Sequence, residues 1–281
     1  MSQLPPPRTV LDKDAVLAGL FASWEKLEAL LAGLSDEQWR HPTALPGWTV
    51  HDIVAHIIGT EELLAGSPVP DNASARPQYV LNDLGVMNEA WVQYLRPQTP
   101  ASMLENFRRV TGVRTAMLGS MTTDLWNAVT ATPVGPDSYG RFMRVRVFDC
   151  WFHEHDIRDA LGLVADSGAL AGPDTRLALD EITASMGFVV GKLGSAPEGS
   201  RVLLDLTGAV ARQIRVAVAG RAVLVEDFGG EEPTIAIAMD GLQFTRLAGG
   251  RPMGTDRPQD IDYRGDREVG ARIVANLRYV P

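Results

Sequence analysis

The spacing of apolar residues changes once along this 281-residue chain, at the stretch GSAPEGS, residues 194–200. Before this stretch, apolar residues recur every three or four positions, as expected for helices with one buried face. After it, short segments rich in β-branched residues alternate with Gly, Asp and Pro, which is typical of β-strands and their turns. The change predicts two domains: a helical bundle over residues 1–196 and a small α+β domain over residues 197–281.

Start and stop signals predict the helices of the first domain. Thr49 is a good N-cap residue, and Asp52 three residues later completes a variant of the capping box. Pro100 follows a second N-cap residue, Thr99, and suits the first position of a helix. On this basis helices are expected over residues 10–33, 49–66, 80–95, 99–121, 141–162 and 174–194.

The second domain is predicted to contain a sheet and two helices. Its first strands follow one another without a helix between them, so an antiparallel sheet is expected. These strands are expected at residues 201–208, 212–220, 221–227 and 233–240. A helix at 241–250, a strand at 259–265 and a closing helix at 266–280 complete the pattern.

Composition argues against several classes of protein. The net charge of −9 argues against a broad surface for nucleic acid or anionic membranes. No apolar run approaches the roughly 20 residues of a membrane span, and the N-terminal stretch lacks the features of a signal peptide. One cysteine, Cys150, permits neither an intrachain disulfide nor a cysteine-rich zinc site. We therefore expect a cytoplasmic protein, either a monomer or a homodimer.

The segment VFDCWFHEHDIRDALG, residues 147–162, places charged side chains in an otherwise apolar helix. Asp149 and His153 are four residues apart, so they lie together on one helix face. A buried carboxylate requires a partner or a metal, and His56 on an earlier helix can converge with this pair inside a bundle. Two imidazoles and one carboxylate suit a catalytic zinc or a non-haem iron. A buried His–Asp hydrogen-bonded pair is the alternative.

The neighbouring polar and aromatic residues are given structural roles. Adjacent helix positions point about 100° apart, so Cys150 leaves the metal face and is expected to be a small buried hydrophobe. His155 also faces elsewhere, whereas Asp156 lies one turn from His153 and can orient its imidazole. Arg146 is expected to make surface or interhelix contacts, and Trp48 is not assigned to a pocket.

Two pairs of motifs carry a family resemblance. LPGWTVHDIVAHIIGTEELL, residues 45–64, and RVFDCWFHEHDIRDALG, residues 146–162, resemble signatures of the mycothiol-dependent maleylpyruvate isomerase family, a branch of the DinB-like four-helix proteins. FTRLAGGRP, residues 244–252, and DIDYRGDREVGARIVANL, residues 260–277, resemble the small sterol-carrier-like domain of that family. The resemblance covers nearly the whole chain and implies a DinB-like bundle followed by this α+β domain.

The resemblance also implies a ligand set. A histidine on the second helix, then an acidic residue and a histidine four apart on a later helix, hold zinc in the family. These positions fall on His56, Asp149 and His153. The family's isomerase has Glu where this chain has Asp149, which is shorter by one methylene. A basic residue of the C-terminal domain is implied to reach the site, and Arg251 in LAGGR is the best match.

The function that follows is catalysis with a thiol cofactor, mycothiol. Zinc deprotonates a coordinating thiol, which supplies a nucleophile without a protein cysteine. The expected partners are this small-molecule thiol and an electrophilic substrate, whose carboxylate Arg251 would bind. Addition and release of the thiolate would isomerise a double bond, and lasting attachment would be S-transfer. The alternatives are a non-catalytic carrier of an apolar ligand and a metal-dependent hydrolase or oxygenase on the same triad.

Overall fold

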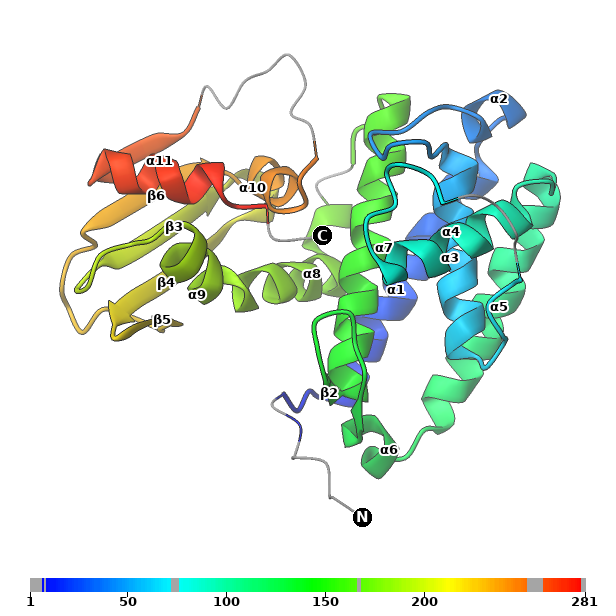
Figure 1. Cartoon of the computed structure of the whole chain (residues 1–281), viewed down its shortest axis with the longest axis horizontal. Coiled ribbons are helices and arrows are strands. Elements are labelled where there is room, and N and C mark those ends of the chain that lie inside the picture. Colours follow the sequence, from blue (N-terminus) through cyan, green and yellow to red (C-terminus); the bar gives the residue numbers. More distant parts are fainter. Residues whose placement is uncertain (1–6, 8, 72–75, 166–167, 252–259, 279–281) are drawn as a thin grey trace. The chain divides into compact units, whose positions relative to one another are not determined.

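The chain forms two compact units in the computed structural model, which describes residues 7, 9–71, 76–165, 168–251 and 260–278 (Figure 1). The first unit contains Met1–Ala165 and Gly172–Leu177, and the second contains Asp166–Ala171 and Ala178–Pro281. The first is helical and the second holds a sheet, as the hydrophobic pattern predicted. The predicted domain boundary at residues 196 and 197 lies inside the second unit and stays a prediction.

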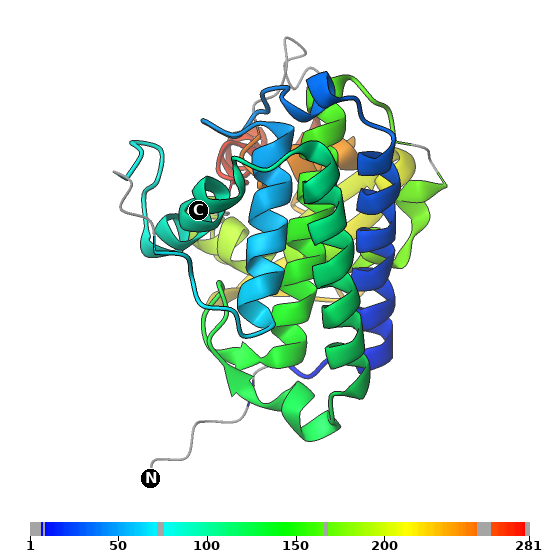
Figure 2. The same ribbon diagram turned by 90° about the vertical axis from the view of Figure 1, so that its right-hand side faces the viewer.

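Four long helices build the first unit. Helix α1 packs against α5 and α7, and α3 packs against the same two helices, so the four lie side by side (Figure 2). Their bounds are Lys13–Ala32 for α1, Val50–Leu64 for α3, Pro100–Ser120 for α5 and Tyr139–Leu161 for α7. Shorter elements complete the unit: α2 (Asp36–Trp39), α4 (Asp83–Leu95), α6 (Thr123–Asn127) and the hairpin of β1 (Val129–Thr130) and β2 (Asp137–Ser138). Within the described part of the chain, none of the helices is both long and apolar enough to cross a membrane.

Local capping fixes where the two site-bearing helices begin and end. The predicted capping box at α3 is present, because the Thr49 hydroxyl accepts from Asp52 N and the Asp52 carboxylate accepts from Thr49 N at 2.9 Å. Helix α7 begins after the N-cap Ser138, whose Oγ accepts from the amide of Arg141. It ends at Gly162, which adopts a left-handed conformation with φ of 64°. These caps set the ends between which the site residues lie.

The single helix predicted over residues 174–194 is wrong. The structure divides it into α8 (Pro173–Ala184), α9 (Met186–Phe188) and a π-helical turn, η2 (Val189–Leu193). Gly187 and Gly191 lie against Ala222 of β5, where a Cβ on either glycine would crowd that residue. Glycine is a poor helix former, and this close approach to a strand favours the interrupted helix.

The second unit contains a mixed sheet with strand order β5-β4-β3-β6-β7. Its strands are β3 (Arg201–Thr207), β4 (Arg212–Ala219), β5 (Arg221–Leu224), β6 (Ile235–Asp240) and β7 (Asp262–Gly265). The expectation of a wholly antiparallel sheet is wrong, because β3 and β6 pair in parallel. Residues 225–234 lead from the edge strand β5 to the far side of β3, so β6 does not form a hairpin with the strand before it.

Burial alternates along β3, as the sequence pattern predicted. Along β3, Val202, Leu204 and Leu206 are buried while their neighbours are half-exposed. Helices α10 (Gly241–Ala248) and α11 (Arg267–Ala275) pack against this sheet, and the 3-10 turns η1 (Ala169–Ala171) and η3 (Gly208–Val210) contact each other. The second unit therefore has an apolar core of its own.

Gly59 sets how closely α4 approaches α3, and this generates a test of the packing. A Cβ at Gly59 would overlap the Trp91 side chain of α4, whereas a Cβ at Gly112 of α5 would meet nothing within 4 Å among the described residues. We expect Gly59→Ala to lower the free energy of unfolding by about 1–3 kcal/mol through overpacking. Gly112→Ala should raise it by about 0.5–1 kcal/mol through helix propensity. Urea unfolding of both variants measures this, and equal stabilities would contradict the described packing.

Candidate metal centre

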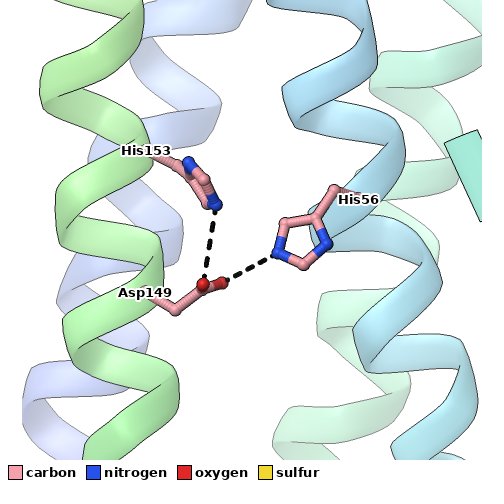
Figure 3. Close-up of side chains that lie close together, drawn as sticks. All are labelled: His56, Asp149 and His153. Carbon is pink, nitrogen blue, oxygen red and sulfur yellow. Dashed lines mark hydrogen bonds and ion pairs between the residues drawn. The ribbon is translucent and has the colours of Figure 1, made fainter. Parts of the chain in front are cut away.

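His56, Asp149 and His153 converge between α3 and α7 (Figure 3). His56 Nε2 lies 3.3 Å from Asp149 Oδ2, and His153 Nε2 lies 3.5 Å from Asp149 Oδ1. One ligand atom from each residue lies within 4.8 Å of the other two. The structure thus brings together the three residues that the helical spacing and the resemblance selected. Their role as metal ligands stays a prediction.

The three side chains differ in their access to solvent. His56 and His153 are each 6% exposed, but the Asp149 side chain is 28% exposed. The His153 ring is anchored on its other side, where Nδ1 lies 3.0 Å from Asp156 Oδ2. This contact matches the orienting role expected of Asp156, and it leaves Nε2 of His153 facing Asp149.

The charges at the site are strongly coupled. Burial alone would raise the pKa of Asp149, but Arg146, His153 and His56 hold it well below its usual range, so Asp149 is a carboxylate. Burial disfavours a charged His153, yet Asp149 and Asp156 outweigh burial and raise its pKa to about 9. Burial lowers the pKa of His56 despite Asp149, which favours the neutral imidazole that binds metals.

A buried network of charges adjoins the carboxylate. Arg146, which is 3% exposed, donates from Nη1 to Asp149 Oδ2 at 2.5 Å and from Nε to Glu61 Oε1 at 2.9 Å. The second Glu61 oxygen accepts from Arg114 Nε at 3.0 Å, and both of these side chains are fully buried. The interhelix contact expected for Arg146 is present, but Arg146 is not a surface residue.

Sequence reasoning missed Glu61 and Arg114, although a signal existed. Glu61 lies four residues after the buried Ile57, and Arg114 lies four after the buried Val110, so both occupy helix positions that face the core. Charged residues at such positions require partners of opposite charge. Glu61 and Arg114 could therefore have been paired with each other from the sequence.

Trp48 forms one wall of the site. Its ring centroid lies 5.4 Å from that of His56 and 6.4 Å from that of His153. Trp48 Nε1 donates to Glu89 Oε2 at 3.2 Å, and Glu89 is 5% exposed and also accepts from the hydroxyl of Tyr79. Trp48 lies in the loop before α3, where no helical period could assign its direction.

The other residues considered from the sequence lie outside the group formed by His56, Asp149 and His153. Cys150 is buried, and burial raises the pKa of its thiol to about 12, so this residue is not a thiolate at neutral pH. His155 faces Trp151, with ring centroids 4.1 Å apart, which agrees with its expected place off the metal face. Arg251 belongs to the second unit and donates from Nη1 to the carbonyl of Gly249 at 2.7 Å. Its approach to the site stays a prediction.

The donor set fits a divalent metal. Two imidazole nitrogens face one carboxylate, both histidines are buried, and Asp156 fixes the ring of His153. Three protein ligands at a partly exposed position leave room for a ligand from solution, which distinguishes catalytic from structural zinc sites. The same donors also suit a non-haem iron.

The raised pKa of His153 makes the stability of the metal-free protein depend on pH. Its contribution to stability is fully present below the unfolded pKa of 6.5 and is lost as pH rises through about 9. We expect the free energy of unfolding of metal-free protein to fall between these pH values. His153→Gln should remove most of this decrease. Urea unfolding across the range measures it, and identical slopes for both proteins would contradict the Asp149–His153–Asp156 interaction.

Comparisons with known proteins agree with the fold. The crystal structure of the mycothiol-dependent maleylpyruvate isomerase matches with a TM-score of 0.58 and 16% identity, over 90% of this chain and 93% of that chain. A histidine-to-alanine mutant of that enzyme matches with a TM-score of 0.55 over the same shares. An uncharacterized protein of Mycobacterium tuberculosis is 26% identical over 208 residues, which cover 70% of this chain and 74% of the relative.

Two family models match the chain in succession. The mycothiol maleylpyruvate isomerase N-terminal domain matches residues 20–158, which contain the complete candidate centre. The C-terminal domain of the same family matches residues 176–272, which contain the sheet. The chain therefore belongs to the mycothiol-dependent maleylpyruvate isomerase family.

Proposed function

We propose that this protein is a metal-dependent isomerase or S-transferase that uses a low-molecular-weight thiol, mycothiol, and acts on a small electrophilic substrate. The convergence of His56, Asp149 and His153 at a partly exposed point between two helices carries the proposal. Family membership and the match to a mycothiol-dependent maleylpyruvate isomerase support the choice of thiol and of reaction class.

The proposed roles of the residues follow from their contacts. His56, Asp149 and His153 would hold a divalent metal, for which we propose zinc, while Asp156 keeps the His153 ring in place. When bound there, the metal would supply a lowered pKa to a coordinating thiol, which would then be a thiolate at neutral pH. Trp48 packs beside the two imidazoles. Because Cys150 is buried with a raised pKa, the nucleophile comes from the thiol cofactor.

The proposed reaction uses addition and release of the thiolate. The thiolate of a bound cofactor would add to an electron-poor carbon–carbon double bond, the resulting single bond would permit rotation, and the thiolate would leave unchanged. No electron or proton is consumed in this cycle. If the adduct instead takes up a proton and stays intact, the product is a thioether and the reaction is S-transfer. Arg251 is proposed to bind a carboxylate of the substrate through its guanidinium.

Metal binding provides the first test. We expect the protein to bind one Zn²⁺ or Co²⁺ per chain, with affinity reduced on the order of 100-fold in His56→Ala and His153→Ala, since even residues that only support ligands contribute 10–100-fold. His155→Ala on the same helix is the matched control and should retain the affinity of wild type. Equilibrium dialysis with metal analysis measures the affinities.

A chelator distinguishes the metal-dependent enzyme from a carrier of apolar ligands. Removal of a bound metal lowers the melting temperature, because a ligand that binds only the folded state stabilises it. A carrier of apolar ligands would not respond to the chelator. Freshly purified wild type that contains no metal, together with unaltered stability of both alanine variants, would contradict the proposed metal centre.

Catalysis provides the second test. We expect the metal-loaded protein to convert maleylpyruvate to its trans isomer only when mycothiol is present, as followed by ultraviolet absorbance. Arg251→Ala should raise KM by about tenfold through loss of a charge-assisted contact to the carboxylate. Arg264→Ala, which removes an exposed arginine of the same unit, is the control. Turnover without any thiol would favour a hydrolase-type reaction on the same triad.

A further inference from the structure

We propose that Arg146 is a positioning residue that holds Asp149 by one oxygen and balances its charge, so that the metal centre keeps a high affinity for an anionic ligand. This inference depends on the proposed function, because it assumes a metal at the triad that binds a thiolate. The structural observations behind it are the contacts of Arg146 with Asp149 and Glu61.

The two carboxylate oxygens of Asp149 have different surroundings. Oδ2 accepts from Arg146 Nη1 at 2.5 Å and lies 3.3 Å from His56 Nε2. Oδ1 lies 3.5 Å from His153 Nε2 (Figure 3). A carboxylate whose one oxygen is bonded to a guanidinium is a poor bidentate ligand, so Asp149 offers Oδ1 as its principal donor atom.

Arg146 cannot leave this position easily. Its Nε donates to Glu61 Oε1 at 2.9 Å, its side chain is 3% exposed, and that of Glu61 is fully buried. Glu61 is held in turn by Arg114, whose Nη2 donates to the Tyr139 hydroxyl at 2.9 Å. The orientation of Asp149 therefore depends on contacts that run from α5 through α3 to α7.

The same contacts determine the charge beside the site. Arg114, Glu61, Arg146 and Asp149 alternate in sign and sum to zero. A divalent metal would bind both imidazoles in their neutral form, and because Arg146 balances the Asp149 carboxylate, that carboxylate would cancel less of the metal charge that attracts an anion. Without Arg146, the Asp149 carboxylate would cancel part of that charge and weaken the attraction.

Arg114 is the matched control for Arg146, because its loss shows what the removal of a buried arginine does to the structure alone. Both arginines are buried and both donate to Glu61, but of the two only Arg146 is described in contact with Asp149. Loss of either arginine removes one of the two guanidinium partners of Glu61. A difference between Arg146→Met and Arg114→Met at the metal centre therefore reports on positioning rather than on general stability.

The experiment uses Co²⁺ as the metal and azide as the anion, with the full chain. In Arg146→Met, we expect azide affinity to fall at least about tenfold while Co²⁺ affinity is retained or rises, because a positive charge has been removed near the metal. Arg114→Met should keep the azide affinity of wild type. General damage to the site would weaken both Co²⁺ and azide binding, so the opposite directions identify the charge effect.

Arg146→Lys distinguishes the effect of the positive charge from the effect of holding Asp149 in position. This variant also replaces Arg146→Met in the experiment if Arg146→Met does not fold. Lysine keeps the charge but lacks the planar fork that reaches Glu61 and Asp149 together. We expect azide affinity near that of wild type and a changed visible spectrum of bound Co²⁺. The inference is overturned if Arg146→Met, or Arg146→Lys in its place, leaves both the spectrum and the azide affinity as in wild type. It is also overturned if Arg114→Met has the same effects as Arg146→Met. Wild type that binds no Co²⁺ at the triad overturns the proposed function and this inference with it.

Discussion

The buried Glu61 carboxylate, bonded to two arginines, is the interaction on which the first unit depends. It lies on α3 and receives one guanidinium from α5 and one from α7, so a single side chain links three of the four long helices. Burial of charges without partners is costly, and removal of one partner of such a set typically costs several kcal/mol. The relative rotation of these helices is therefore set by hydrogen bonds as well as by apolar packing, and the candidate centre lies beside this link.

Much of the candidate centre could be predicted from the sequence because helical geometry is regular. Asp149 and His153 had to share a face, and His56 had to face the same interior if the helices packed as a bundle. The core-facing positions of Glu61 and Arg114 were a usable signal, but the full network spans three helices whose relative rotation no single segment determines. Trp48 was not assigned for a different reason: it lies in a loop, where a repeating period gives no direction to a side chain.

The second unit shows a similar division. The alternation of apolar and polar residues in the sequence predicted its strands, since the period of a strand is a local property. Pairing is not local, and β6 lies parallel to β3 because residues 225–234 cross the sheet instead of turning back. The break between α8 and η2 depends on contact of Gly187 and Gly191 with β5, which is likewise a tertiary effect.

At Asp149, the shorter side chain relative to glutamate does not prevent contact with both histidines.

The burial of Cys150 has a consequence for durability. A catalyst that carries its own reactive thiolate exposes its polypeptide to irreversible oxidation, because susceptibility follows thiolate character and solvent access. Here the one cysteine of the chain is buried and its pKa is raised to about 12. In the proposed reaction, oxidants would consume a small thiol that diffuses away and is replaced, while the buried cysteine of the protein stays reduced.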